Sequence, residues 1–189
     1  SSSAASDVYK RQAFNSDPTS AFGGIVSCNF KINEKIAKEI NKIFFEVVIG
    51  NGFEKKALKI LKKKKNLRII DSSKVKKFND LKFFSNGEAV LLQTADENKF
   101  ETQNFKVVSK TKPNSKTLKN LIFAFNVCRF VKSNAIVITQ KETTIGIGSG
   151  QTSRLDSCEL AINKMNKFHK LKNEEILAAS DAFFPFIDG

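Results

Sequence analysis

The segment from residue 134 to residue 155 contains the side chains best suited to binding chemistry in this chain of 189 residues. Its two short apolar runs, separated by a polar turn, predict a β-hairpin. Ser153 and Asp156 form an S-x-x-D pattern that predicts the start of a helix. A helix N-terminus beside the guanidinium of Arg154 suits an anion. Alternating glycines could let such a ligand approach the backbone: Gly146, Gly148 and Gly150.

This glycine pattern does not fit the common nucleotide-binding loops. A dinucleotide fingerprint requires G-x-G-x-x-G between a strand and a helix of a crossover unit, and here the third glycine comes one residue early, after a hairpin. A phosphate-binding P-loop requires G-K-[ST], which does not follow. Two interpretations of the glycines therefore remain open, an anion site and a tight turn that joins hairpin to helix.

Acid–base or metal catalysis by this chain is poorly supported. His169 is the only histidine and lies in a polar sequence, KFHK, where a surface role is expected. The sequence also lacks the H-x-E and P-C-x-x-C patterns that hold a catalytic zinc. The residues are better suited to holding a substrate than to moving its protons.

The C-terminal sequence SDAFFPF admits two interpretations. Its phenylalanines, Phe183, Phe184 and Phe186, can be part of the core. Alternatively, with Asp181 and Asp188 beside them, they can form a pocket in which a flat heteroaromatic ligand stacks while a carboxylate accepts its N–H groups.

The composition favours a soluble cytoplasmic protein. The formal net charge is +13, but only four of the 32 basic residues are arginine, which indicates the codon bias of an AT-rich genome rather than nucleic-acid binding. No apolar run approaches the roughly 18 residues of a spanning helix, and no secretory signal opens the chain. The three cysteines lie far apart, as expected of reduced thiols.

Alternating strands and helices predict an α/β fold with a mixed sheet. The predicted strands are 25–28, 46–49, 67–70, 89–93 and 176–179, with a short extended piece at 105–108 and the hairpin over 135–147. The predicted helices follow a cap at Asn33 with apolar positions from Ile36 to Ile43, and span 54–65, 116–130 and 153–169.

Six motifs in order resemble one enzyme family. They are DPTSAFGGIV (17–26), FFEVVIGNGF (44–53), KKKKNLR (62–68), VKSNAIV (131–137), TIGIGSGQTSRLDS (144–157) and SDAFFPFIDG (180–189). Together they resemble the transformylase domain of the AICAR transformylase/IMP cyclohydrolase family. The likeness runs from about Ala13 to Gly189, so residues 13–189 are expected to be a partial transformylase domain. Residues 1–12 are expected to be a disordered or non-native leader.

The resemblance implies transfer of a formyl group from 10-formyltetrahydrofolate to the 5-amino group of AICAR, a late step of purine synthesis. It also implies a cytidine-deaminase-like mixed sheet flanked by helices, without the deaminase zinc. Members of the family are homodimers whose transformylase sites are completed across the subunit interface, and neither nucleic acid nor a membrane is an expected partner. A monovalent cation near Asp181 is compatible with the family.

The resemblance also implies roles for individual residues. Four are expected to contact AICAR: Gly23 and Glu46, and, in the partner subunit's site, Asn134 and Arg154. Three are expected to contact the folate: Leu155, Phe183 and Asp188.

Three departures from the family bear on activity. Its K-H-x-x-P motif, which supplies the catalytic lysine and base, belongs upstream of Asp17 and is not in this sequence. Its R-H-F-R-H ending and its cyclohydrolase domain are not in this sequence either, so the chain alone is expected to be inactive. The alternative is a basic α/β module that binds RNA or anionic metabolites.

Overall fold

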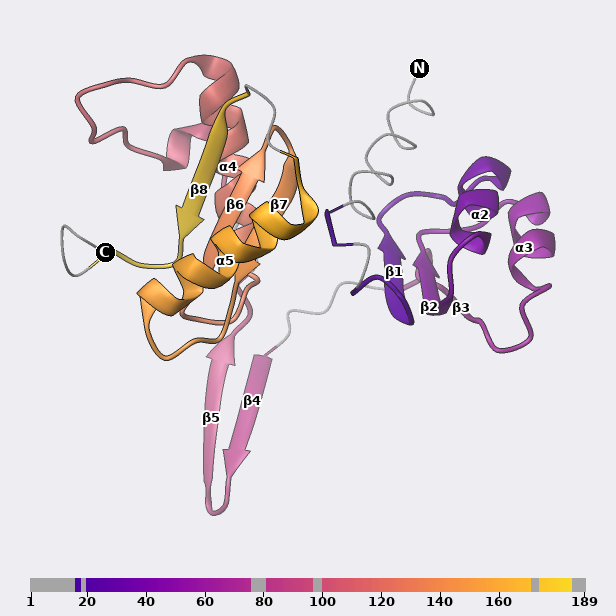
Figure 1. Cartoon of the computed structure of the whole chain (residues 1–189). Helices are drawn as coiled ribbons and strands as arrows, with labels where there is room; N and C mark the ends of the chain where they lie inside the picture. The colour runs from indigo at the N-terminus through magenta and orange to yellow at the C-terminus, as the bar shows by residue number, and fades with distance from the viewer. Residues whose placement is uncertain (1–15, 18–19, 76–80, 97–99, 171–173, 185–189) are drawn as a thin grey trace. The chain divides into compact units, whose positions relative to one another are not determined.

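The computed structural model describes residues 16–17, 20–75, 81–96, 100–170 and 174–184. The chain divides into two compact units (Figure 1), which we call the N-terminal unit (residues 19–99) and the C-terminal unit (residues 1–18 and 100–189). The expected leader, residues 1–12, and the expected folate residue Asp188 lie outside the described residues. Among the residues described, no helix is long and apolar enough to cross a membrane.

The N-terminal unit is built on a parallel sheet of three strands in the order β1-β2-β3. The strands are β1 (Gly24–Cys28), β2 (Phe45–Gly50) and β3 (Arg68–Asp71), joined through the helices α2 (Glu34–Asn41) and α3 (Lys55–Leu61). Because both crossovers step in the same direction across the sheet, right-handed connections place both helices on one face. The two helices pack against each other there (Figure 1).

The core of this unit lies between that face and the helices. Asn33 caps α2 by accepting a hydrogen bond from the backbone N–H of Ile36 at 2.9 Å, as its position before the apolar repeat predicts. Ile36, Ala37 and Ile40 of α2 are buried against Val48 of β2. The helical period of these residues is therefore what fixes α2 on the sheet.

A separate hairpin follows in the same unit, made of β4 (Leu81–Asn86) and β5 (Ala89–Thr94). Its turn contains Gly87, whose φ of +59° is the left-handed conformation that glycine tolerates. All twelve strand residues are exposed within the described part of the chain. Only β5 was predicted, because β4 lacks a regular alternation of apolar and polar residues.

The C-terminal unit contains an antiparallel sheet in the order β7-β6-β8. Its elements are η1 (Thr102–Asn104), α4 (Ser115–Cys128), β6 (Ile136–Gln140), β7 (Thr143–Gly148), α5 (Arg154–Phe168) and β8 (Ile176–Ser180). Ile136 and Ile138 of β6 pack with α5, whereas Val137 packs with the end of α4. The two helices therefore cover opposite faces of the sheet (Figure 1), and β6 is buried on both.

Helix α5 lies unusually close to strand β7 because of two glycines. A Cβ atom on Gly148 would lie 1.7 Å from the carbonyl oxygen of Ser157, and one on Gly146 would lie 2.2 Å from that of Ala161. Positions i and i+2 of a strand are about 6.6 Å apart, close to the roughly 6 Å between positions i and i+4 of a helix. The strand therefore presents two bare positions that match two small residues on the helix.

Most of the predicted elements are confirmed, and the α/β class with them. The extended piece expected at 105–108 is irregular, and the helix expected to reach residue 65 ends at Leu61. The described strands form separate parallel and antiparallel sheets, so the single mixed sheet expected from the sequence is not what they form.

Replacing Gly148 by alanine should destabilise the C-terminal unit by roughly 2–4 kcal/mol, since the methyl group overlaps the backbone of α5. The free energy of unfolding can be measured by urea denaturation followed by circular dichroism. Gly87→Asn is the control: nothing lies within 4 Å of its added Cβ, and asparagine tolerates left-handed backbone. Equal losses in the two variants would contradict this account.

Candidate functional site

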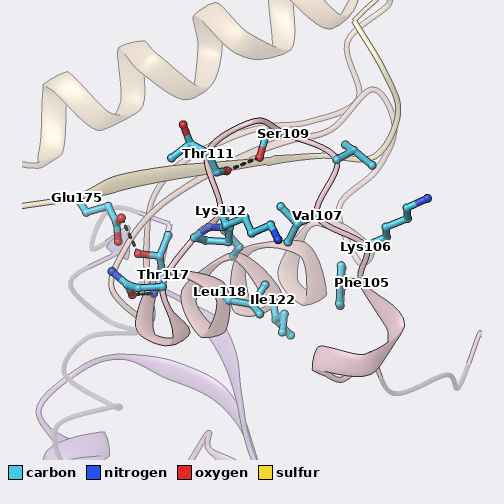
Figure 2. A pocket seen from close by; sticks show the side chains of 14 residues that line it. Phe105, Lys106, Val107, Ser109, Thr111, Lys112, Thr117, Leu118, Ile122 and Glu175 are labelled. Carbon is cyan, nitrogen blue, oxygen red and sulfur yellow. Dashed lines mark hydrogen bonds between the residues drawn. The ribbon is translucent and has the colours of Figure 1, made fainter.

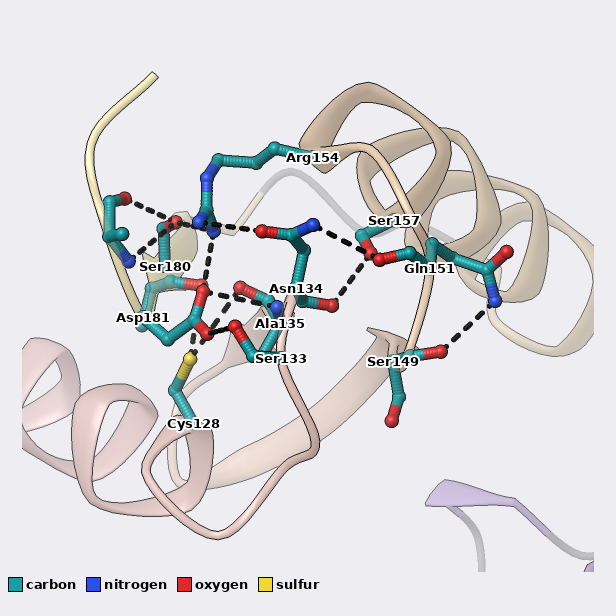
Figure 3. Close-up of polar contacts among 12 residues, drawn as sticks. Cys128, Ser133, Asn134, Ala135, Ser149, Gln151, Arg154, Ser157, Ser180 and Asp181 are labelled. Carbon is teal, nitrogen blue, oxygen red and sulfur yellow. Dashed lines mark hydrogen bonds and ion pairs between the residues drawn. The ribbon is translucent and has the colours of Figure 1, made fainter. Parts of the chain in front are cut away.

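The carboxylate of Asp181 is the centre of a polar network at the end of β8 (Figure 3). Its Oδ1 accepts hydrogen bonds from Arg154 Nη1 at 2.5 Å and from the backbone N–H of Ala135 at 3.1 Å. Its Oδ2 accepts a hydrogen bond from the hydroxyl of Ser133. One side chain thereby joins the end of β8, the segment that leads into β6 and the first residue of α5.

Arg154 is held in this network by its guanidinium group. Nη1 also donates to Ser180 Oγ at 2.9 Å, and Nη2 donates to Asn134 Oδ1 at 3.0 Å. The side chain of Arg154 is only 10% exposed and that of Asp181 is 20% exposed, so solvent screens their ion pair less than it would on the surface. The sequence expected Arg154 and Asn134 in one site, and the structure places them in direct contact.

Hydrogen bonds at both the nitrogen and the oxygen of its side-chain amide fix the orientation of Asn134. Its Nδ2 donates to the backbone oxygens of Gln151 at 3.0 Å and Thr152 at 3.1 Å. Ser157, one turn into α5, donates its hydroxyl to the backbone oxygen of Asn134 at 2.7 Å. Both amide hydrogens are therefore used within the protein, whereas Oδ1 keeps one acceptor position beyond the bond from Arg154.

The network changes the acidity of two of its groups. Burial alone would raise the pKa of Asp181, but hydrogen bonds from Ser133, Arg154 and Ala135, together with the charge of Arg154, lower that pKa to about 2. Burial, and then the negative charge of Asp181, raise the pKa of the Cys128 thiol to about 11. Asp181 is thus ionised and Cys128 neutral at physiological pH, and the thiol donates to the backbone oxygens of Ala135 and Ala179.

The glycines of the hairpin do not serve the role that the anion interpretation gave them. Gly146 and Gly148 face the backbone of α5 rather than an open ligand position. Gly150, with φ of +68°, donates its N–H to the backbone oxygen of Lys132 at 2.9 Å. The predicted helix start is confirmed: Ser153 caps α5 by accepting from the N–H of Asp156 at 3.0 Å, and Arg154 begins the helix.

In the N-terminal unit, Gly23 and Glu46 lie at neighbouring strand ends. Gly23 has a φ of +71° and donates its N–H to the backbone oxygen of Phe44 at 3.0 Å. Glu46 follows in β2, and its exposed carboxylate lies 4.0 Å from Arg68 Nη1 of β3. A hollow of about 520 Å³ opens here, lined by Phe44, Glu46, Lys65, Asn66, Leu67 and Arg68. Its polar wall suits hydroxyl and anionic groups.

The two described residues expected to contact the folate are both accessible. Leu155 is the second residue of α5 and is 48% exposed, and Phe183 follows β8 and is 81% exposed. Phe184 lines a small apolar groove between α5 and β8. The phenylalanine sequence is therefore not buried core at these two positions, which leaves Phe183 available for stacking.

A larger hollow of about 540 Å³ in the C-terminal unit lies apart from these residues (Figure 2). The loop from Phe105 to Pro113 arches over the first turns of α4, where Leu118 and Ile122 form an apolar floor. Thr117 donates to Glu175 at its edge at 2.8 Å. None of the predicted site residues lines it, so it is not the candidate site.

Metal-binding chemistry finds no support in the part of the chain that the structure describes, where no group of three or more His, Cys, Asp or Glu side chains could hold an ion. His169 ends α5, half-buried, with Nε2 at 3.0 Å from the backbone oxygen of Ser16. The cation expected near Asp181 stays a prediction.

The sequence predicted Arg154 and Asn134 as site residues but not the side chains that hold them in place. Ser133 and Ser157 gave no signal, because serine is common and its partners are distant in sequence. Asp181 was noted only as a neighbour of the phenylalanines and of a cation. Its position immediately after a predicted strand was the available clue.

The chain is similar in sequence to a known enzyme family. The sequence model described as "AICARFT/IMPCHase bienzyme" matches residues 1–164. "Bifunctional purine biosynthesis protein PurH" of Buchnera aphidicola subsp. Schizaphis graminum is 44% identical over 181 residues, covering 94% of this chain and 34% of the relative. The protein of that name from Acetivibrio thermocellus is 41% identical over 191 residues, covering 97% of this chain and 36% of the relative. The chain thus spans about a third of the length of the curated relatives it matches.

Asp181→Asn should destabilise the protein in a pH-dependent way. Because the pKa of Asp181 is lowered to about 2 in the folded state, its ionised form stabilises the fold above its usual pKa, and this stabilisation is lost as the pH falls through about 2. The difference in unfolding free energy between wild type and variant should therefore be largest above about pH 5 and shrink towards pH 2. Urea denaturation across this range measures it.

The control for this experiment is Glu88→Gln, which removes the same charge from the turn of the exposed β4–β5 hairpin. A pH-independent difference for Asp181→Asn, parallel to that of the control, would contradict the assigned network.

Proposed function

Because the chain belongs to the AICARFT/IMPCHase bienzyme family, we propose that it forms part of an enzyme that transfers a formyl group from 10-formyltetrahydrofolate to the 5-amino group of AICAR. The step belongs to purine (IMP) biosynthesis, and the full-length protein also carries IMP cyclohydrolase activity. The observation that carries this proposal is the direct contact between Arg154 Nη2 and Asn134 Oδ1, the two residues that the family motifs assign to AICAR.

The chemistry of the pair suits a carboxamide. Arg154 donates three hydrogen bonds within the protein, from Nη1 twice and from Nη2 once. Its Nε–H and one Nη2–H have no assigned partner among the described residues, and such donors suit a carbonyl or phosphate oxygen. The remaining acceptor position on Asn134 Oδ1 can take an N–H. Together the two side chains can meet both ends of the AICAR carboxamide.

The N-terminal unit contributes the other AICAR contacts in this proposal, Gly23 and Glu46, whereas Asn134 and Arg154 reach AICAR in the partner subunit's site. Glu46 is exposed in a polar hollow, so its carboxylate can accept hydrogen bonds from ribose hydroxyls. Gly23, at the neighbouring strand end, leaves room for the ligand to approach the backbone. Leu155 and Phe183 are accessible for the folate, and Asp188 is assigned to its pterin end by the motif alone.

We further propose that the C-terminal unit has a cytidine-deaminase-like arrangement. Its order of helix, hairpin, helix and strand, with β6 antiparallel to both neighbours, supports this. The enzyme is proposed to be a homodimer whose transformylase sites are completed across the interface, as in the family. Its catalytic Lys-His pair belongs to sequence outside this chain.

Arg154→Gln and Asn134→Ala, made separately in the full-length enzyme, should each raise the KM for AICAR roughly tenfold or more or lower kcat by a similar factor. Each loses a direct contact to the substrate. Steady-state formyl transfer at saturating folate measures this. Arg129→Gln is the matched control, since Arg129 lies against the rings of Phe100 and Phe130 rather than in the site. Wild-type kinetics in both site variants would contradict the proposal.

The purified chain of 189 residues should show no measurable formyl transfer by itself. Loss of a general base and a positioning group costs several orders of magnitude in rate. The assay follows release of tetrahydrofolate, with the full-length enzyme as the positive control. Turnover by the isolated chain would contradict the assignment of the catalytic pair to other sequence.

A further inference from the structure

We propose that Asp181 is a positioning residue for the substrate site, holding Arg154 and the backbone on both sides of Asn134 in the arrangement that the substrate meets. The inference rests on the proposed function, in which Arg154 and Asn134 contact AICAR. It adds a residue that acts through these two and does not itself touch the substrate.

The first line of evidence is that one carboxylate brackets Asn134. The hydroxyl of Ser133 donates to Asp181 Oδ2, and the N–H of Ala135 donates to Oδ1 at 3.1 Å. The N–H of Asp181 in turn donates to the backbone oxygen of Ala135 at 3.3 Å. The residues before and after Asn134 are thus both tied to Asp181, which restricts the direction in which the Asn134 side chain can leave the backbone.

The same carboxylate of Asp181 also fixes the position of the Arg154 guanidinium. The N···O distance of 2.5 Å joins side chains that are 10% and 20% exposed. A guanidinium with this little exposure to solvent needs a counterion, because an unpaired buried charge is strongly destabilising. Ser180, Asp181 and Asn134 use both Nη1 hydrogens and one Nη2 hydrogen, which limits the direction of the remaining donors, Nε–H and one Nη2–H.

The ion pair between Arg154 and Asp181 also determines the net charge beside the bound substrate. Asp181 neutralises most of the positive charge of Arg154, so the substrate is recognised by oriented donors rather than by an unpaired cation. Removing the carboxylate leaves the charge but lets the guanidinium and the segment around Asn134 reorient. Loss of the carboxylate therefore weakens the binding of AICAR and leaves the formyl-transfer step itself unchanged.

The test compares Asp181→Asn with wild type in the full-length enzyme. Asparagine keeps the size of the side chain and one acceptor but loses the ion pair. The KM for AICAR should rise about tenfold, while kcat and the KM for 10-formyltetrahydrofolate stay within about twofold. A purely structural role would lower the amount of active enzyme and leave both KM values unchanged, so AICAR KM within twofold of wild type overturns the proposal.

A double-mutant cycle with Arg154→Gln shows whether Asp181 acts through Arg154. Combining Asp181→Asn with Arg154→Gln should raise the KM for AICAR by less than the product of the two single effects, since Arg154, one of the two groups that Asp181 positions, is already gone. Effects that multiply in full would overturn the positioning role. If Arg154→Gln by itself leaves AICAR kinetics unchanged, the proposed function fails at Arg154, which is a distinguishable result.

Two further variants keep the test decisive if Asp181→Asn does not fold. Asp181→Glu retains the charge but displaces it by one methylene, so the KM for AICAR should rise by an intermediate factor, about threefold. Ser133→Ala removes the donor to Oδ2 but leaves the ion pair with Arg154, so the KM for AICAR should rise by less than it does in Asp181→Asn. Wild-type AICAR kinetics for Asp181→Glu would overturn the proposal.

Discussion

The close packing of helix α5 on strand β7 determines where Arg154 lies. Because Gly146 and Gly148 have no side chains, the backbone of α5 approaches the strand directly. The axis of α5 is then set by backbone contact rather than by deformable side chains, and its first residue is brought to the start of β6. There the hydroxyl of Ser157 reaches the backbone oxygen of Asn134 at 2.7 Å. This packing places the start of α5 where Arg154 reaches Asp181.

Local features of the sequence predicted most of the fold. The caps at Asn33 and Ser153 and the apolar period of α2 depend on neighbours within one helical turn, and each was identified correctly. The hairpin of β6 and β7 was predicted for the same reason. Strand β4 was missed because its apolar residues, such as Phe83 and Phe84, are adjacent rather than alternating and are exposed in the structure.

The structural role of the hairpin glycines could not be predicted, because the α5 residues that they contact are not adjacent to them in sequence. A glycine that admits a ligand and a glycine that admits a helix look identical in sequence, and Ser157 and Ala161 show no sign of being the matching surface. The division into two units follows from similarly long-range contacts. For the site, family motifs supplied Asn134 and Arg154, but only the structure shows that Asp181 pairs with Arg154 and that Arg68 lies beside Glu46.

These charge pairs also explain why a net charge of +13 says little about the substrate. Both proposed AICAR contacts that carry charge have a partner of opposite sign, Arg154 with Asp181 and Glu46 with Arg68. The excess charge lies instead mainly on lysines, whose field is screened over roughly 8 Å at physiological ionic strength. Such a field can speed the approach of a phosphorylated substrate but cannot orient it. In the proposed AICAR site, specific recognition therefore comes from the fixed donors and acceptors of the paired groups.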